Sequence, residues 1–399
     1  METKTGGAHR LEALTGLRFF LAAAVVAYHL QGYGLPTAHW GSGVLHMGVS
    51  LFFVLSGFVL THVYSGLNSG VQVKNFLVAR VARIWPGHLA ALVLLYVVLE
   101  GDPSFHGTGQ DSLILGLTNI FLIHSWIPLT DYFFGYNSVS WSLSVELFFY
   151  LAFPILVWRL DDTKGLKLAF SFVLSIACLE FALLSNLPAL PVPGATLSAA
   201  GVMCFNPVAR LFEFVTGMIA ARLWRQHGGS LPRGRVSASI MEVAIIATVV
   251  FVAHHLGLVA TQTQPSVNAS LSVWISKGGL LAPATALLIA VFASGHGCFS
   301  RLLASAPMRV LGEISFMIYL VHQIVLRAYV LRKDWFADWS GAQSLSLYIC
   351  VVLVISALMW RFVETPLRRW IIATFSATER RTMSERSDSS GRQRLERFG

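Results

Sequence analysis

The chain has 399 residues, of which 55% are hydrophobic and only 12% are charged. A soluble domain carries about 25% charged residues, so this composition excludes a soluble globular protein and predicts a protein that crosses a membrane many times. The formal net charge is +9, but the basic residues lie between apolar stretches and near the C-terminus. Basic residues at these positions are explained by membrane topology, because cytoplasmic connections are rich in Lys and Arg. We therefore expect no nucleic-acid partner. The four cysteines form no CxxC pair, and we predict neither a disulfide framework nor a metal site.

Apolar stretches long enough to cross a bilayer recur along the whole chain. Cytoplasmic connections are enriched in Lys and Arg, so the basic connections test how many stretches cross. Connections with Lys or Arg should alternate along the chain with connections that have none. They do so only if the stretch at 111–127 does not cross, and the connection at 331–342 is the one exception. The alternative is that 111–127 crosses and another span is miscounted. The candidate stretches lie at about 14–33, 43–65, 84–100, 111–127, 139–158, 166–187, 204–223, 238–258, 270–294, 311–331 and 343–363.

The sequence therefore predicts an all-α, polytopic transmembrane bundle of about ten spans. The stretch at 111–127 is interpreted as a re-entrant or surface helix, and both termini are expected in the cytoplasm. We divide the chain into a short N-terminal segment (1–13), a membrane-embedded domain (14–370) and a basic tail (371–399). The tail is rich in charge and serine and is expected to be disordered. With no soluble catalytic domain expected, any chemistry must take place inside the bundle.

Two polar residues interrupt the first apolar stretch. Arg18 and His29 are eleven positions apart. On an α-helix this spacing is about three turns, so both side chains leave the same face, roughly 16 Å apart along the axis. Charged and titratable groups in a span are costly, and a cation with an imidazole deeper in the membrane could hold the two ends of one long ligand. The alternative is that Arg18 snorkels to the headgroups and His29 is a satisfied core histidine.

A second cationic motif precedes the third span. Arg80 and Arg83 are three positions apart and so share one face of a helical turn, where paired guanidiniums can grip a phosphate. Simple positive-inside flanking is the alternative interpretation. Pro86 is expected to break the helix or to mark its start.

Further polar groups lie inside the later spans. Glu146 and His29 are at similar depths from the outer face. They could therefore act together in general-base catalysis, with the Glu146 carboxylate orienting the His29 ring. Ser56 belongs to a small-residue sequence that favours close helix packing over catalysis. Arg210 and Glu213 have the spacing of an intramembrane ion pair. His322 could line the same cavity as His29 or only bond to a neighbour.

Taken together, these motifs resemble the membrane acyltransferase-3 family, bacterial O-acyltransferases of surface polysaccharides, peptidoglycan and some macrolides. The resemblance covers nearly the whole chain up to about residue 370, and the seven motifs occur in order. They are the Arg-x10-His pattern of Arg18 and His29, FFVLSGF at 52–58, RxxR at 80–83, WSLSVE at 141–146, RLFEFVTG at 210–217, GEISFMIYLVH at 312–322 and VETP at 363–366.

The resemblance implies ten core helices and acyl-CoA, by default acetyl-CoA, as a co-substrate rather than a permanently bound cofactor. It makes His29 the expected base, Glu146 its helper, and Arg18, Arg80 and Arg83 the donor-binding cations. Transient acylation of His29 is an alternative that the sequence leaves open. The resemblance also makes a further group of residues candidates for contact with the substrate. These are Ser56, Trp141, Ser142, Tyr319 and His322.

The expected acceptor is a carbohydrate or a glycosylated compound, reached by a protein in the bacterial cytoplasmic (inner) membrane. The rival function is a transporter or flippase of a glycan or lipid-linked precursor. Such proteins are often built from inverted repeats and paired broken helices, and the sequence shows neither. The sequence does not identify the acceptor or the length of the acyl chain.

Overall fold

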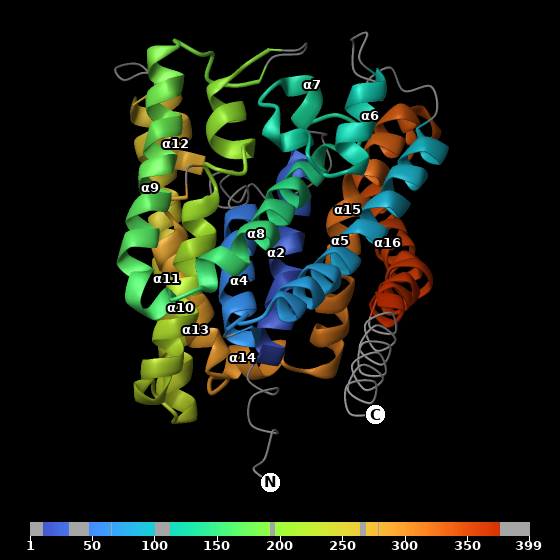
Figure 1. The fold of residues 1–399 in the computed structure, drawn as a ribbon. Helices are drawn as coiled ribbons and strands as arrows, with labels where there is room; N and C mark the ends of the chain where they lie inside the picture. Colours follow the sequence, from blue (N-terminus) through green and yellow to red (C-terminus); the bar gives the residue numbers. More distant parts are fainter. Residues whose placement is uncertain are drawn as a thin grey trace, which may run out of the picture.

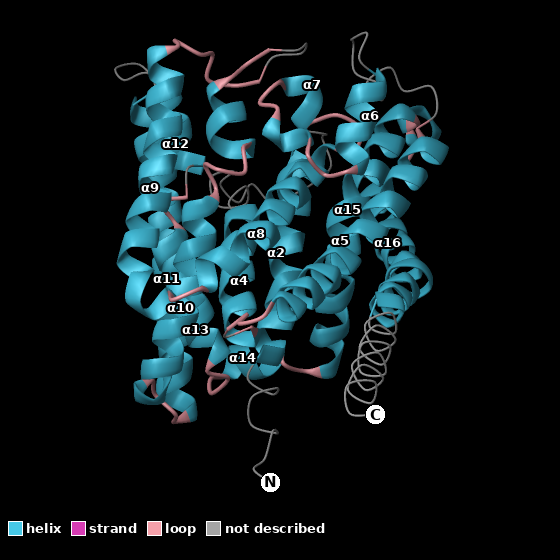
Figure 2. Cartoon of the chain, viewed as in Figure 1, coloured by secondary structure: helices cyan, strands magenta, loops and turns pink. Residues whose placement is uncertain are grey.

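The computed structural model describes residues 11–31, 48–64, 66–99, 112–191, 196–263, 269–277 and 279–375. Within these ranges every regular element is a helix, and a single isolated bridge joins Leu129 to Leu197 (Figure 2). The predicted all-α bundle is therefore confirmed. The expected disordered tail begins within a helix that runs through residue 375, and its remainder, 376–399, lies outside the described residues.

Eight helical stretches in the described part of the chain are long and apolar enough to cross a membrane. Two shorter helices, α4 and α10, pack closely on each other among them (Figure 1). Eight of the ten predicted spans are thus confirmed by length and composition, and α4 and α10 lie at the positions of the other two. In chain order they are α2 (Glu12–Leu30), α4 (Gly48–Val63), α5 (Gly70–Val98), α8 (Trp141–Val157), α9 (Leu160–Leu184), α10 (Leu211–His227), α11 (Arg235–Thr263), α12 (Ala269–Lys277) with α13 (Ala282–Ala293), α15 (Ala306–Leu331) and α16 (Gly341–Met359).

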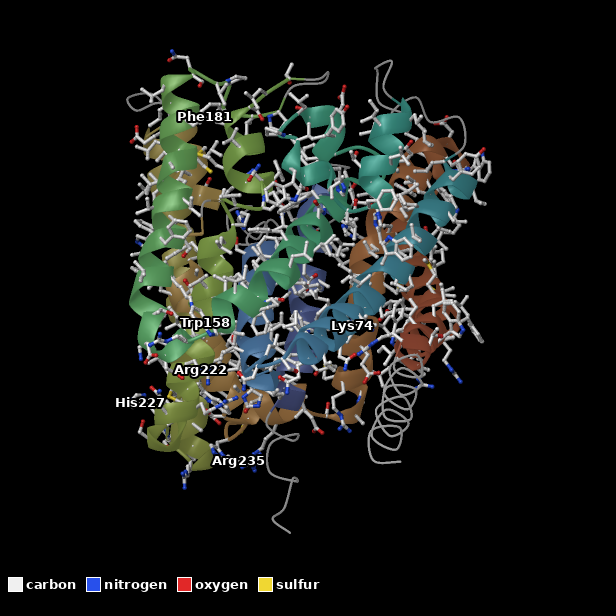
Figure 3. The ribbon with its side chains drawn as sticks, viewed as in Figure 1. Lys74, Trp158, Phe181, Arg222, His227 and Arg235 are labelled. Atoms are coloured by element: carbon white, nitrogen blue, oxygen red, sulfur yellow. The ribbon has the colours of Figure 1, made fainter. Side chains whose placement is uncertain are left out.

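Short helices connect the long ones at the two ends of the bundle. In Figure 1, α6 and α7 lie at one end and α14 at the other. The side chains of Arg222 and Arg235 lie at the α14 end, whereas Phe181 lies at the opposite end (Figure 3). The short elements are α6 (Ser112–Ile120), η3 (His124–Trp126), α7 (Thr130–Phe133), η4 (Ser138–Ser140), η5 (Gly201–Phe205), η6 (Gly228–Ser230), α14 (Cys298–Leu303), η7 (Lys333–Phe336) and η8 (Trp360–Glu364).

The stretch at 111–127 does not form a span. Its helix α6 has nine residues and is followed by a turn and the short helix η3. Nine residues rise only about 14 Å, against about 30 Å for the hydrocarbon core. This agrees with the interpretation of 111–127 as a helix that enters or lies on the membrane without crossing it.

The prediction that Pro86 breaks or starts a helix is wrong. Helix α5 runs without interruption for 29 residues from Gly70 to Val98, with Pro86 buried in its interior. Proline removes one backbone hydrogen bond, and close packing in a helix bundle can absorb this loss. As a consequence Arg80 and Arg83 belong to a long helix rather than to a connecting loop.

Two of the spans are interrupted, which the sequence analysis did not detect. Residues 206–210 separate η5 from α10, and Gly279, with a φ of +89°, lies between α12 and α13. Arg210 links the two interruptions: it donates to the carbonyl of Lys277, to Ser50 at 2.7 Å and to Glu213 at 2.8 Å. The predicted pairing of Arg210 with Glu213 is confirmed. One backbone carbonyl at the second interruption, that of Lys277, is thus bonded to a side chain from the first.

Glycines let the central helices approach one another. A Cβ atom at Gly57 of α4 would meet the carbonyl of Phe214 in α10, and one at Gly312 of α15 would meet the carbonyl of Thr15 in α2. Small residues permit such backbone contacts in membrane bundles, where packing drives association. These contacts pack α4 against α10 and α15 against α2, and α2, α4 and α15 are three walls of the central cavity described next.

Candidate active site

A cavity of about 700 Å³ lies between α2, α4, α5, α8 and α15 and is closed on one side by residues 360–372. Its volume is typical of a pocket for a small ligand or cofactor. Seven of the predicted site residues line it, although they come from five different helices. They are Arg18, Ser56, Arg80, Arg83, Ser142, Glu146 and Tyr319.

The cavity is rich in positive charge. Five guanidiniums line it, together with two carboxylates, Glu146 and Glu313, and a third carboxylate, Glu364, bonds one of the guanidiniums from behind. The excess of cations makes the cavity suited to an anionic ligand, because like charges gathered in a low-dielectric site repel one another until an anion binds. The five arginines are Arg18, Arg80, Arg83, Arg368 and Arg369.

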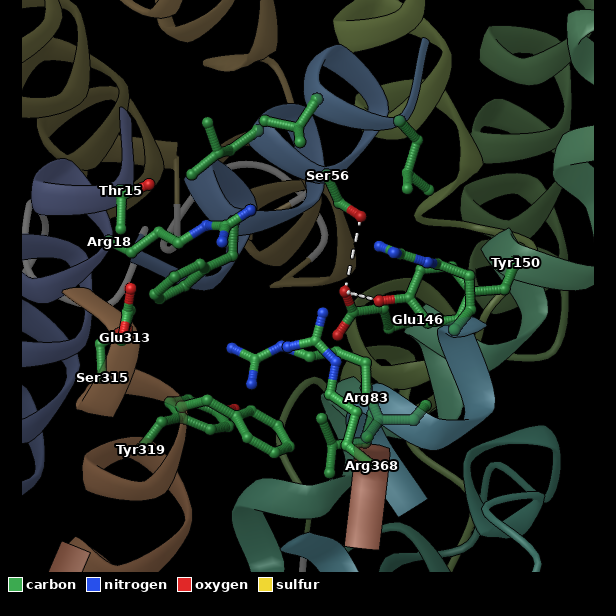
Figure 4. Close-up of a pocket in the computed structure, with 18 of the residues that line it drawn as sticks. Thr15, Arg18, Ser56, Arg83, Glu146, Tyr150, Glu313, Ser315, Tyr319 and Arg368 are labelled. Carbon is green, nitrogen blue, oxygen red and sulfur yellow. Dashed lines mark hydrogen bonds between the residues drawn. The ribbon is translucent and has the colours of Figure 1, made fainter. Parts of the chain in front are cut away.

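The arginines of the cavity differ in how many hydrogen bonds and ion pairs they already make with the protein. Arg83 forms an ion pair with Glu364, a carboxylate that is 1% exposed. Arg80 donates to the hydroxyl of Tyr64 at 3.2 Å, while its Nε is buried without a partner. Arg18 makes no hydrogen bond or ion pair within the described residues, and Figure 4 shows it beside the cavity. Arg368 and Arg369 likewise make none within the described residues, so these three arginines and Arg80 keep more unused bonding capacity than Arg83.

Glu146 is held by residues of the cavity wall. It accepts hydrogen bonds from Tyr150 at 2.5 Å and from Ser56 at 3.4 Å (Figure 4). The expected pairing of Glu146 with His29 is not found, since neither side chain bonds the other. Equal depth in the membrane did not bring them together, because each is directed toward a different neighbouring helix.

The partner of His29 is His322 of α15. Nδ1 of His29 and Nε2 of His322 are 3.0 Å apart, and Nδ1 of His322 is 2.7 Å from the carbonyl of Tyr319. His322 is fully buried, while His29 keeps part of its surface exposed. Of the two alternatives for His322, the structure favours the bond to a neighbour, but that neighbour is the candidate base itself.

Tyr319 ends the cavity on the side of this histidine pair. Its hydroxyl bonds to Ser142 at 2.8 Å and donates to the carbonyl of Val139 at 2.9 Å. Its ring lies 5.9 Å from the ring of His322, and neither histidine is among the cavity's lining residues. The expectation that Arg18 and His29 face one continuous cavity is therefore not met in this structure.

Trp141 lies outside the cavity as well. Its ring packs against Phe53 and Phe205, with centroid separations of 6.1 and 4.8 Å. Its carbonyl accepts a hydrogen bond from Ser125 at 2.9 Å, which ties η3 to the start of α8. This position indicates a packing role rather than the substrate contact that the sequence analysis proposed.

Several residues in or beside the cavity were not predicted as site residues. Tyr150 lies one turn after Glu146, and that i, i+4 spacing could have identified it. Glu364 belongs to the VETP motif and Arg368 follows that motif, but their sequence positions do not indicate that they lie beside the other cations. No sequence pattern identifies Tyr64 as a site residue, because its contact with Arg80 depends on how α4 packs against α5. Among the described residues, no three His, Cys, Asp or Glu side chains lie close enough to hold a metal ion.

Comparison with known proteins places this geometry in context. The acyltransferase-3 family, described as "Acyltransferase domain", matches residues 11–361. Acyltransferase MdmB of Streptomyces mycarofaciens is 31% identical over 384 residues, which cover 90% of this chain and 92% of that protein. No solved structure matches the chain.

Two further relatives are longer proteins. The peptidoglycan O-acetyltransferase OatA of Listeria monocytogenes is 27% identical over 90% of this chain, and the O-acetyltransferase OatA of Staphylococcus aureus is 26% identical over 90%. The matched regions span 56% and 57% of these two proteins, respectively. The family match extends over most of the described bundle and includes most of the cavity's lining residues. The chain therefore belongs to the membrane acyltransferase-3 family and is a multi-pass acyltransferase.

Proposed function

We propose that this acyltransferase moves an acyl group, acetyl in the simplest case, from cytoplasmic acyl-CoA to a hydroxyl of a carbohydrate or glycosylated acceptor. The observation that carries the proposal is the cation-lined cavity of about 700 Å³. Coenzyme A joins several phosphates to a long, flexible thiol arm, so a guanidinium cluster at one end of a deep cavity complements it. The O-acetyltransferase relatives support a hydroxyl acceptor, and peptidoglycan as the substrate of one of them supports a carbohydrate.

In this proposal Arg18 and Arg80 contact the donor phosphates directly, and Arg83 contributes from its ion pair with Glu364. Ser56 and Ser142 line the path of the thiol arm. The protein resides in the bacterial inner membrane with the guanidinium end facing the cytoplasm, where acyl-CoA is made. Both termini lie on that side, as the distribution of basic connections predicts.

The transfer step is assigned to His29. Its ring takes the proton of the acceptor hydroxyl while the hydroxyl oxygen attacks the thioester carbonyl carbon. The carbon–sulfur bond then breaks, and the departing thiolate takes the proton from the imidazolium. Transient acylation of His29 followed by transfer to the acceptor is the alternative order of steps. Glu146 lies at the donor end, so its part is to shape the cavity around the thioester arm rather than to orient His29.

For a donor bound in the guanidinium-lined cavity to react at His29, its thioester must pass Tyr319. This side chain separates the cavity from the histidine pair and is anchored by two hydrogen bonds, to Ser142 and to Val139. We therefore include a movement of Tyr319 on acceptor binding as part of the proposal. Until that movement, the ring would keep water on the histidine side away from the bound thioester.

The decisive experiment uses purified, reconstituted protein with isotope-labelled acetyl-CoA and a panel of glycan acceptors. Label should appear on the acceptor with the wild-type protein. It should be lost in His29→Ala, while binding of CoA itself, measured by calorimetry, is retained. Movement of an unmodified glycan across the bilayer without transfer of label would instead support a transporter. Normal turnover by His29→Ala would remove His29 from the mechanism.

A further inference from the structure

The hydrogen bonds around His322 determine which nitrogen of His29 can act as the base. A neutral imidazole carries one proton, and the bond made by one nitrogen decides the state of the other. Nδ1 of His322 lies 2.7 Å from the carbonyl oxygen of Tyr319. A carbonyl oxygen only accepts, so Nδ1 of His322 must carry the proton.

With its proton on Nδ1, the neutral His322 ring presents a bare Nε2 to its partner. That atom is 3.0 Å from Nδ1 of His29, so Nδ1 of His29 must be the donor of this bond. A doubly protonated His322 is disfavoured, because the ring is fully buried and bonds to no carboxylate. The bonds therefore run in one direction, from His29 through His322 to the carbonyl of Tyr319.

We infer that His322 is a positioning residue that holds His29 in the tautomer protonated on Nδ1, so that Nε2 of His29 is the proton acceptor of the transfer reaction. Nε2 of His29 makes no hydrogen bond within the described residues, and the ring keeps part of its surface exposed. This inference rests on the proposed role of His29 and gives the orienting task, first assigned to Glu146, to His322.

The inference also explains how charge is accommodated during the reaction. When Nε2 of His29 takes the acceptor's proton, the ring becomes an imidazolium. The bond from its Nδ1–H to His322 then becomes charge-assisted and stronger. The bond of His322 to the Tyr319 carbonyl passes part of this polarisation to the backbone. The proton returns from Nε2 to the departing thiolate, so no net proton moves along the chain of bonds.

The test combines a direct measurement of the tautomer with kinetics. The full-length protein, labelled with ¹⁵N at histidine, is studied in lipid nanodiscs by NMR, and the His29 signals are those lost in His29→Gln. Wild-type His29 should be protonated at Nδ1 and bare at Nε2. His322→Leu should give a mixture of tautomers, and His322→Gln, whose amide oxygen can accept from Nδ1–H, should keep the wild-type state.

The value of kcat should depend on which tautomer His29 adopts. His322→Leu should lower kcat about 10²-fold with KM for acyl-CoA almost unchanged, because orientation is lost but donor contacts are not. His322→Gln should recover most of that loss. His88→Leu is the matched control: it removes another buried ring bonded to a backbone carbonyl, and should change thermal stability without changing the His29 tautomer.

Two outcomes would overturn the inference: a wild-type His29 protonated at Nε2, or unchanged kcat and tautomer in His322→Leu. Both can occur while His29→Ala is inactive, in which case the proposed function stands and only the role of His322 fails. If His29→Ala is active, the assignment of His29 as the base fails, whatever tautomer the wild-type ring adopts.

Discussion

Arg83 of α5 and Glu364 of η8 form an ion pair that joins the third span to the end of the last one. Glu364 is 1% exposed and the Arg83 side chain 19%. Removing one partner of such a buried pair leaves the other charge uncompensated, which costs about 3–5 kcal/mol in typical proteins. One of the three arginines predicted to bind the donor phosphates is therefore also a structural residue.

Arg83→Ala should lower the melting temperature of the detergent-solubilised protein as well as weaken donor binding. The double variant with Glu364→Gln should recover part of the lost stability, because it removes the unpaired carboxylate. Arg80→Ala is the matched control, since Arg80 bonds a tyrosine hydroxyl rather than a carboxylate. If Arg83→Ala melts like the wild type, the ion pair contributes nothing to stability.

Arg368 should add to donor binding, although it follows the last span in sequence. It lines the cavity, and its charge lies close enough to those of Arg80, Arg83 and Arg18 to repel them. Arg368→Ala should raise KM for acetyl-CoA about tenfold with kcat little changed, the size expected for one charge-assisted contact. With acetyl-pantetheine, which has no phosphate, the same substitution should have no effect.

A suitable control for Arg368 is Arg361, which is exposed and does not line the cavity. Arg361→Ala should leave both donors unaffected. An equal loss with acetyl-CoA and acetyl-pantetheine in Arg368→Ala would indicate a structural role and refute the assignment of Arg368 as a phosphate contact.

Tyr319 should control the leak of the donor to water. Tyr319→Ala removes the ring that separates the cavity from the histidine pair, so release of CoA without acceptor should rise several-fold. Tyr319→Phe keeps the ring but loses the two hydroxyl bonds, and a smaller rise is expected. Free thiol measured with a thiol-reactive dye reports the leak. Tyr329→Ala, at a tyrosine stacked on Phe336 away from the cavity, serves as control. No increase in Tyr319→Ala would show that the ring is not the barrier.

His124 should make the fold sensitive to mild acid. It is fully buried in the segment that does not cross the membrane, and burial lowers its pKa to about 3. In the unfolded chain its pKa is about 6.5, so protonation favours unfolding. Its contribution to stability is therefore complete above about pH 6.5 and is lost as the pH falls toward 3, at about 1.4 kcal/mol per pH unit for one proton.

Melting temperatures between pH 7 and pH 5 test this prediction. The wild-type value should fall more steeply than that of His124→Gln, which cannot titrate. His227→Gln, at an exposed histidine, should behave like the wild type. Parallel curves for the wild type and His124→Gln would contradict the predicted role of His124.

Much of the architecture could be predicted because it depends on local properties of the chain. A span is recognised from the length of its apolar stretch, and the side on which each end lies follows from nearby Lys and Arg. Of the seven predicted residues that line the cavity, the charged ones stood out because charges are rare in and beside apolar spans, and the family resemblance supported the choice. Local properties did not predict that Pro86 lies inside a long helix, or that two spans are interrupted and joined through Arg210.

The apolar stretches and their polar interruptions suffice to predict a helical membrane bundle and the position of each cation, carboxylate and histidine along its span. Which of these groups meet depends on how the helices pack. Depth follows from position along one helix, but a contact also requires the rotation of each helix and the choice of its neighbours, which packing of many residues sets together. For this reason His29 bonds to His322 rather than to Glu146, and Arg83 is bound to Glu364.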